Sequence, residues 1–242
     1  MPTPSQGVQG SARGPVANGT SMRPYDWIVF DSTGTLMTPD PEPAVAYQAA
    51  GRRLGLDVPL EAVRRNLKSA MGKHFLGACA DLPTDAAYER QRWKQIVRDA
   101  LLGLPEHRLE DVFDQLWEYF AVPDHWQVFA DVAPTLQRLR RQGYRLAVAS
   151  NFDARLRRIL EGMQLTDQVD EILISSDLGW SKPNPRFYGA ATERLAAADR
   201  SRVLMIGDTH HGDVVVARES GWHARHLVRD QADALSTLTA DL

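Results

Sequence analysis

The sequence predicts an α/β protein: a Rossmann-like, doubly wound parallel sheet with a small all-helical cap domain inserted into it. Three observations lead to this fold class. Short apolar runs alternate with helical patterns, which is typical of a parallel sheet covered by helices on both faces. Four of the expected strands end in polar residues. The stretch 41–124 has helical periodicity without strand signals.

Five short apolar runs are the expected strands of the core. They are Trp27–Phe30, Arg145–Ala149, Glu171–Ile174, Arg202–Ile206 and Ala224–Val228. Between them, Pro134 and Gly143 mark the start and end of one helix, since proline suits a first turn and glycine a left-handed cap. Asn184 with Pro185 is an N-cap signal for another helix, and a third should end at Gly221.

The predicted helical cap spans residues 41–124 and divides the core into residues 24–40 and 125–242. Prolines 39, 41 and 43 mark its entry, and Pro123 marks its exit. Because this insertion follows the first expected strand, we expect it to lie over the end of that strand as a lid. Residues 1–23 are rich in Gly, Ser and Pro and have no apolar core of a signal peptide, which predicts a disordered tail.

The charge balance argues against nucleic acid or a membrane as a main partner. The 242 residues include 28 basic and 31 acidic side chains, for a net charge of −3. No apolar run approaches the roughly 20 residues that span a bilayer. The single cysteine, Cys79, cannot form an internal disulfide, which fits a cytoplasmic protein. A small molecule is the expected partner of a monomer or homodimer.

Polar residues follow four of the expected strands. They are Asp31, Ser150 with Asn151, the run 175–177 (Ser-Ser-Asp), and Asp208. Ligands of open α/β sheets bind at the carboxyl ends of the strands, so we expect the four groups to form a single site. Taken singly, each has a structural explanation as a turn residue, a helix cap or a solvated charge. Their joint occurrence favours a site.

Three of these groups, together with Lys182, belong to four ordered motifs: Asp31-Ser-Thr-Gly-Thr-Leu36, Ser150-Asn151, Lys182-Pro183, and Gly207-Asp208-Thr-His-His-Gly-Asp213. The set resembles the haloacid dehalogenase-like hydrolase superfamily over roughly residues 24–230, and the helical insertion lies where one type of that superfamily's cap lies. The resemblance implies a Mg²⁺-dependent phosphohydrolase that acts on a small phosphorylated metabolite through an aspartyl-phosphate intermediate.

The resemblance also implies roles for individual residues. Asp31 would be the nucleophile, and Lys182 would neutralise it and the phosphoryl oxygens. Ser150, the backbone N–H of Asn151 and the loop that contains Thr33 would bind the phosphate. The Mg²⁺ ligands would be Asp31, the Thr33 carbonyl, Asp208 and Asp213, the last either directly or through water. Oxygen ligands suit this hard cation.

Thr33 departs from the family pattern. In most phosphatases of the superfamily this position, two residues after the nucleophile, holds an Asp that acts as general acid and base. A Thr hydroxyl has no useful basicity near neutral pH, so about 10²–10⁴-fold of rate would be lost or supplied by another group. The same sequence resembles the Asp-Lys-Thr-Gly-Thr motif of P-type ATPases. We expect a slow phosphatase, or one limited to good leaving groups such as acyl or aryl phosphates.

Three alternatives remain open on the sequence. A 2-haloacid dehalogenase needs no metal, so the retained Asp208 and Asp213 argue against it. A phosphonate hydrolase needs a cap lysine, for which Lys68 and Lys73 are available. A degraded phosphatase fold that only binds a phosphorylated ligand or a partner is favoured by Thr33 alone.

The cap offers candidates for substrate specificity in the sequence SAMGKHF, residues 69–75, chiefly Lys73 and His74. We expect this stretch to be a loop over the site or, alternatively, an ordinary helix connection. His210 and His211 are expected near the site, where one could replace the missing acid. The two RLRR runs at 138–141 and 155–158 are expected to be solvated helix faces.

Overall fold

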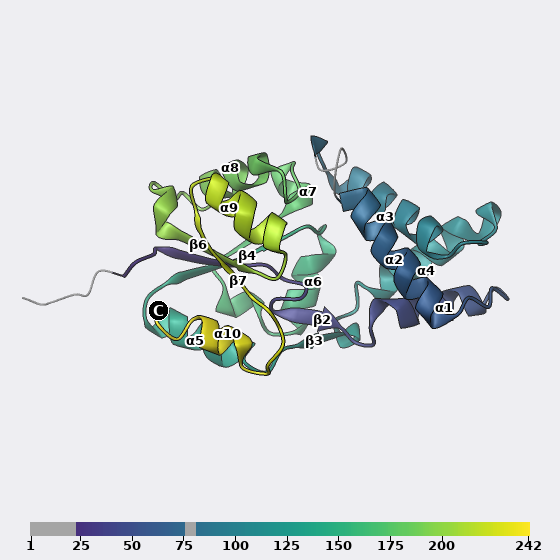
Figure 1. Ribbon diagram of the computed structural model, residues 1–242, viewed down its shortest axis with the longest axis horizontal. Coiled ribbons are helices and arrows are strands. Elements are labelled where there is room, and N and C mark those ends of the chain that lie inside the picture. The colour runs from purple at the N-terminus through teal and green to yellow at the C-terminus, as the bar shows by residue number, and fades with distance from the viewer. Residues whose placement is uncertain (1–22, 76–80) are drawn as a thin grey trace, which may run out of the picture.

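Five parallel strands form the central sheet in the computed structural model, which describes residues 23–75 and 81–242 (Figure 1). Their order is β5-β4-β1-β6-β7, and every pairing between neighbours is parallel. The strands are β1 (Trp27–Phe30), β4 (Arg145–Ser150), β5 (Glu171–Ile174), β6 (Val203–Gly207) and β7 (His223–His226). The chain order reverses on either side of β1, so the predicted doubly wound fold is confirmed.

Helices cover both faces of this sheet. Along β1, Ile28 and Phe30 pack into one apolar cluster while Trp27 and Val29 pack into the other. This alternation is the two-residue period of a strand buried on both sides. The first face carries α5 (Val132–Arg141), α6 (Arg155–Gly162) and α10 (Ala234–Leu238). The second carries α8 (Pro185–Arg194) and α9 (Val216–Glu219).

A separate group of helices stands beside the sheet in Figure 1 and corresponds to the predicted insertion. It consists of α1 (Pro43–Arg52), α2 (Leu60–Phe75), α3 (Ala86–Ala100) and α4 (Leu109–Tyr119). These helices share a third apolar cluster, which includes the fully buried Val63 and Phe113. The insertion therefore has a hydrophobic core of its own. The residue limits proposed for the cap and for the core stay predictions.

A two-stranded antiparallel sheet that the sequence does not predict joins the two ends of the insertion. It pairs β2 (Met37–Pro39) with β3 (Trp126–Val128), and Met37 lies opposite Val128. Each strand has three residues, too few to show a two-residue period in the sequence. The pairing brings the entry and the exit of the insertion together at the edge of the core.

Most of the residues predicted to begin or end helices do so in the structure. The side chain of Asn184 accepts a hydrogen bond from the backbone N–H of Arg186 at 2.9 Å and so caps α8. Gly143 and Gly221 adopt positive φ angles of 86° and 89° after α5 and α9. The helix expected at Pro134 begins two residues earlier, at Val132. The expected tail up to residue 22 and Cys79 lie outside the described residues.

Within the described ranges, none of the helices has both the length and the apolar character needed to cross a lipid bilayer.

Candidate active site

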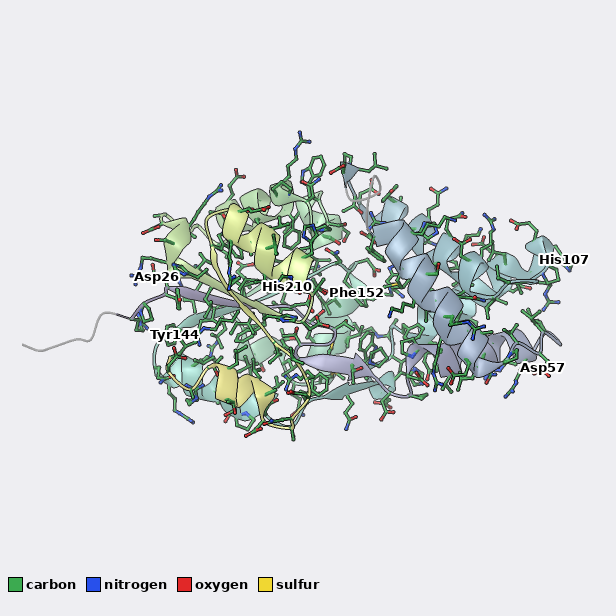
Figure 2. All side chains as sticks on the ribbon, in the orientation of Figure 1. Asp26, Asp57, His107, Tyr144, Phe152 and His210 are labelled. Carbon is green, nitrogen blue, oxygen red and sulfur yellow. The ribbon has the colours of Figure 1, made fainter. Side chains whose placement is uncertain are left out.

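The carboxyl ends of the strands face the helical insertion. Figure 2 shows Phe152, just after β4, between the sheet and the helices, while Asp26 and Tyr144 lie at the opposite ends of the strands. A cavity of about 470 Å³ lies at this junction and includes Asp31 and Lys182 in its walls. This is the crevice in which open α/β sheets bind ligands.

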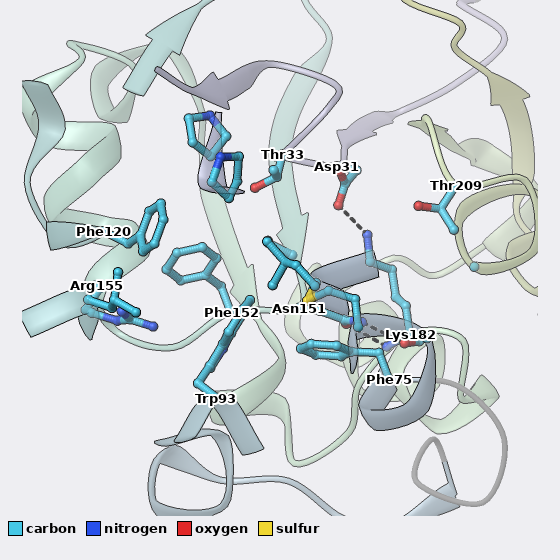
Figure 3. Close-up of a pocket in the computed structure, with 18 of the residues that line it drawn as sticks. Asp31, Thr33, Phe75, Trp93, Phe120, Asn151, Phe152, Arg155, Lys182 and Thr209 are labelled. Carbon is cyan, nitrogen blue, oxygen red and sulfur yellow. Dashed lines mark hydrogen bonds and ion pairs between the residues drawn. The ribbon is translucent and has the colours of Figure 1, made fainter. Parts of the chain in front are cut away.

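Lys182 is the centre of a buried ionic cluster at one end of the cavity (Figure 3). Its ammonium donates to Asp31 Oδ1 at 2.7 Å, to Asp213 Oδ1 at 2.6 Å and to the Ala149 carbonyl at 2.9 Å. Three acceptors satisfy all three protons of the ammonium. The side chains of the three ionic residues are at most 11% exposed, so water screens these charges weakly.

Burial and the neighbouring charges shift the pKa values of this cluster. Burial raises the pKa of Asp31 to about 7, although the Lys182 ammonium opposes that shift. Burial lowers the pKa of Lys182, but the carboxylates of Asp213 and Asp31 outweigh it and hold this pKa above its ordinary value. Lys182 therefore stays a cation at neutral pH. This cation favours the charged form of the Asp31 carboxylate.

Asn151 fixes the position of Lys182 through its backbone. The side-chain oxygen of Asn151 accepts from the Lys182 N–H at 2.7 Å, and its amide nitrogen donates to the Lys182 carbonyl at 2.6 Å. On the same strand end, the hydroxyl of Ser150 shares a 2.6 Å hydrogen bond with that of Ser32. The sequence predicts Ser150 and Asn151 at the site, whereas the paired hydrogen bonds between Asn151 and the Lys182 backbone are visible only in the structure.

Asp31, Asp208 and Asp213 can jointly hold a cation. Each offers a carboxylate oxygen, and these atoms lie within 4.8 Å of one another. Desolvation and the nearby charge of Asp213 raise the pKa of Asp208. Three oxygen donors around one point suit a hard divalent ion such as Mg²⁺. The residues present therefore fit the expected metal.

Two glycines allow the acidic residues to approach the backbone. A Cβ at Gly34, where φ is +86°, would lie 2.3 Å from Asp208 Oδ2. A Cβ at Gly207 would lie 2.4 Å from the carboxyl group of Asp213. Any larger residue at either position would displace a carboxylate. The glycines of the first and fourth motifs thus determine the positions of the acids.

Thr33 and His211 both line the cavity, and they are exposed residues. His211 belongs to a π-helical turn, His210–Val215, which follows β6 and also carries Asp213. His210, in contrast, packs edge-on against His226 with ring centroids 5.4 Å apart. Of the two histidines singled out in the sequence, His211 is the one that reaches the cavity.

The fourth polar strand end does not join the site. Residues 175–178 form a short helix, α7 (Ser175–Leu178), after the edge strand β5. The Ser175 hydroxyl donates to the Phe152 carbonyl at 3.0 Å, and Asp177 pairs with Arg157 at 2.7 Å on the surface. β5 is separated from β1 by β4, which explains why its polar end lies apart. The expectation of four converging groups was wrong for this one.

Lys73 and His74 also point elsewhere than expected. Both bind Asp99 Oδ2 of α3, at 2.7 and 2.9 Å. The SAMGKHF stretch is the last part of helix α2 and is not a loop. Its cavity-lining members, within the described residues, are Met71, Gly72 and Phe75.

Arg155 was misjudged as part of a solvated helix face, although it lines the cavity. Its guanidinium binds both oxygens of Asp153, at 2.8 and 2.7 Å, and donates to the Trp117 carbonyl at 3.0 Å. It also lies 3.3 Å from the centre of the Trp117 ring. Phe152 was missed altogether. A single large apolar residue after the Ser-Asn pair carries no signal that separates a site from a core.

A buried polar cluster connects the helical insertion to the core near Lys182. Glu89 and Arg92 of α3 form a 3.0 Å ion pair, with side chains 0% and 3% exposed. Arg92 also donates to Ser181, the neighbour of Lys182, at 3.2 Å. Burial raises the pKa of Glu89, and the charge of Arg92 opposes the shift. The helix that borders the cavity is thus linked to the loop that carries the lysine.

The fold and this arrangement of carboxylates and lysine define a hydrolase of the α/β class. The family model for haloacid dehalogenase-like hydrolases matches residues 25–221. The chain belongs to this family, as the sequence motifs predicted.

Relatives that match most of this chain are similar to it across the family region. Haloacid dehalogenase-like hydrolase domain-containing protein 3 of Mus musculus is 32% identical over 217 residues, which cover 86% of this chain and 83% of that protein. Phosphoglycolate phosphatase of Aliivibrio fischeri is 28% identical over 200 residues, 81% of each chain. Both similarities extend across the core and the insertion.

Among solved structures, the magnesium-bound HAD-hydrolase YfnB of Bacillus subtilis has a TM-score of 0.70 at 16% identity. It covers 91% of this chain and 99% of that one. A HAD phosphatase of Thermococcus onnurineus has a TM-score of 0.59 at 25% identity, covering 85% and 87% of the two chains. A dehalogenase crystallised with an intermediate has a TM-score of 0.66 at 22% identity, covering 87% and 88%. The first and third of these likenesses concern the fold alone.

Proposed function

We propose that this hydrolase is a Mg²⁺-dependent phosphatase of small phosphorylated molecules that works through an aspartyl-phosphate. The observation that carries the proposal is the joining of Asp31, Lys182 and Asp213 by hydrogen bonds of 2.6–2.7 Å beside the cavity. Asp31 is the proposed nucleophile. Lys182 holds it in place and offsets the negative charge that builds up when a carboxylate approaches a phosphate.

The proposed phosphate site surrounds the open side of Asp31. Ser150, the backbone N–H of Asn151 and the backbone after Asp31, at Thr33, bind the phosphoryl oxygens. Because Asn151 clamps the backbone of Lys182 on both sides, it also acts as a positioning residue for the lysine. Each of these groups contributes by holding charge where the transition state develops it.

The proposed magnesium ligands are Asp31, Asp208, Asp213 and the Thr33 carbonyl. When bound, the ion supplies positive charge that screens the phosphate and the nucleophile from each other. The three carboxylates would supply three of the oxygen ligands that such a hard cation takes. We propose a cytoplasmic protein whose partner is a small phosphorylated substrate.

The test is hydrolysis of p-nitrophenyl phosphate with and without Mg²⁺ by wild type, Asp31→Asn and Thr33→Asp. We expect turnover in the wild type that needs the ion, and a loss of about 10⁴-fold or more in Asp31→Asn, which lacks the nucleophile. Thr33→Asp restores an acid and should turn over faster. Thermal unfolding of each variant, with added Mg²⁺ and without it, reports metal binding independently of activity.

Two results would contradict the proposal. Turnover that is equal in wild type and Asp31→Asn excludes Asp31 as the nucleophile. Release of halide from 2-chloropropionate without a metal, and no release of phosphate from any ester, would replace it with a dehalogenase.

A further inference from the structure

The cavity wall opposite the ionic cluster is aromatic. It includes eight aromatic side chains, four of them (Phe75, Trp93, Phe120 and Phe152) labelled in Figure 3; the other four are Tyr47, Phe113, Trp117 and Trp126. They come from helices α1 to α4, from the carboxyl end of α4, from β3 and from the loop after β4. A cavity of about 470 Å³ with such walls has the size and character of a site for an apolar organic group.

The aromatic side chains are fixed against one another. Phe75 and Trp93 meet edge to face with ring centroids 5.6 Å apart, and Trp126 meets Phe152 in the same way at 6.0 Å. Phe120 lies 6.4 Å from Trp126, again edge-on. Edge-to-face pairs of this kind leave other ring faces and edges free to contact a further ring.

The cavity offers little to a second anionic group on a substrate. Its lining cations, among the described residues, are Lys182 and Arg155. Lys182 is shared by two carboxylates and a carbonyl. Arg155 is paired with both oxygens of Asp153 and packed on Trp117. A carboxylate that entered beside the aromatic wall would lose water without gaining the full charge of either cation.

The acidic residues of the lining are also already hydrogen-bonded and are poor proton donors. Asp31 and Asp213 both accept from Lys182, and Thr33 presents only a hydroxyl. A leaving group that departs as a stable anion depends least on a proton donor. Phenols, with a pKa of about 10 as in tyrosine, are far better leaving groups than alkyl alcohols.

We propose that the preferred substrates are phosphate monoesters of uncharged phenols with large ring systems, the ring seated against the aromatic wall. This inference rests on the proposed phosphatase function. Asp31 forms a bond to phosphorus as the bond from phosphorus to the aryl oxygen breaks, and the aryloxide takes a proton from water. Water then cleaves the aspartyl-phosphate, which releases inorganic phosphate and restores Asp31.

The experiment compares kcat/KM for four substrates: phenyl phosphate, 2-naphthyl phosphate, 2-naphthylmethyl phosphate and phosphoglycolate. The first two differ in ring size at similar leaving-group pKa. The third keeps the large ring but leaves as an alkoxide, and the fourth is small and carries a second charge. We expect 2-naphthyl phosphate to exceed phenyl phosphate by about tenfold or more, because added apolar contact in a pocket is worth this much. The other two should react more slowly than 2-naphthyl phosphate.

Gly72 provides a variant that narrows the cavity. It lines the cavity, and a Cβ there would meet no atom within 4 Å. Gly72→Leu should therefore fold and lower the ratio of 2-naphthyl to phenyl hydrolysis by about tenfold. Gly189 of α8 is the matched control, since its Cβ would also meet no atom within 4 Å and it does not line the cavity. Gly189→Leu should leave the ratio unchanged.

The outcomes separate the two proposals. If hydrolysis depends on Asp31 but phenyl phosphate or phosphoglycolate is preferred, the aromatic-wall proposal falls and the phosphatase proposal stands. Equal rates for 2-naphthyl and 2-naphthylmethyl phosphate would show that a proton donor such as His211 acts, and would overturn the aryl preference. If no substrate is hydrolysed in an Asp31-dependent way, both proposals fail.

Discussion

The two ends of the cavity differ in how they are built. At the sheet end, which we call the ionic floor, Asp31, Lys182 and Asp213 are joined by short hydrogen bonds and depend on one another. At the opposite end, the aromatic wall is assembled from rings on several helices and loops. In the ionic floor, each buried charge is stabilised by its ion-pair partner. In the aromatic wall, the stabilisation is spread over many apolar contacts. We therefore expect single substitutions to act very differently in the two places.

The largest effect on stability should come from the floor. Lys182→Met leaves two buried carboxylates without their cation, and removing one partner of a buried ion pair costs about 3–5 kcal/mol. Urea unfolding measures this loss. The control is Lys94→Met, which removes an ion pair with Glu110 whose side chains are 30% and 55% exposed. It should cost much less than Lys182→Met, because water screens an exposed ion pair. Similar losses for the two variants would contradict the interdependence of the floor.

The residues of the ionic floor could be predicted from the sequence, whereas most residues of the aromatic wall could not. Asp31 follows β1, Lys182 comes shortly before the start of α8, and Asp213 lies in the turn after β6. Each has a fixed place in an ordered motif of the sequence. Of the rings, Phe75 lies in the stretch SAMGKHF that the sequence marks for specificity, but Phe152 and most of the others could not be predicted, since a cavity aromatic and a core aromatic look alike in a sequence. Only the packing of separate helices brings them together.

Two further errors have the same origin. Arg155 belongs to an RLRR run that reads as a solvated face, yet a tertiary contact with Trp117 turns it into the cavity. β2 and β3 are too short for a periodic signal and form only because the ends of the insertion meet. The fold class could be predicted from local patterns, but these features depend on contacts between residues distant in the chain.

Gly207→Ala tests how tightly the floor is packed. The new methyl group would lie 2.4 Å from the Asp213 carboxyl, so Asp213 must move away from Lys182. Overpacking of this kind costs about 1–3 kcal/mol, and we expect lower activity as well. Calorimetric unfolding and a phosphatase assay measure the two effects. Unchanged stability and rate would show that the ionic floor accommodates an added methyl group without loss, which would contradict its tight packing.

The ionisation of Glu89, at the junction between the insertion and the core, should make the folding stability depend on pH. Its carboxylate faces Arg92 of its own helix and the more distant charge of Asp153 in the core, and burial raises its pKa in the folded protein. The folded state then binds the proton more tightly than the unfolded state, so stability falls as pH rises above about 4.5. The slope is at most about 1.4 kcal/mol per pH unit.

Glu89→Gln removes this titration. The stability of the variant relative to wild type should therefore increase as pH rises from about 4 to 7, as measured by urea unfolding at each pH. Glu110→Gln, at the surface of the insertion, is the control and should show no such increase. A difference between Glu89→Gln and wild type that is independent of pH would contradict the raised pKa.

The smallest effect belongs to the wall. Gly72 is inside α2, and a Cβ there meets no atom within 4 Å. Gly72→Ala should stabilise the protein by about 0.5–1 kcal/mol, because alanine has fewer conformations than glycine in the unfolded chain. The same change at Gly207 should destabilise it. Thermal unfolding of the two variants gives the comparison. A loss of stability in Gly72→Ala would show that the helix needs the glycine.

The most direct test of the central claim, that Asp31 carries the phosphoryl group, is mass spectrometry of acid-quenched protein after reaction with an aryl phosphate and Mg²⁺. Because Thr33 offers no general base, the phosphorylated form should accumulate in the wild type. We expect one phosphoryl adduct, located on Asp31 by peptide mapping, less of it in Thr33→Asp and none in Asp31→Asn. Continued turnover without any adduct, or an adduct on another residue, would contradict the account.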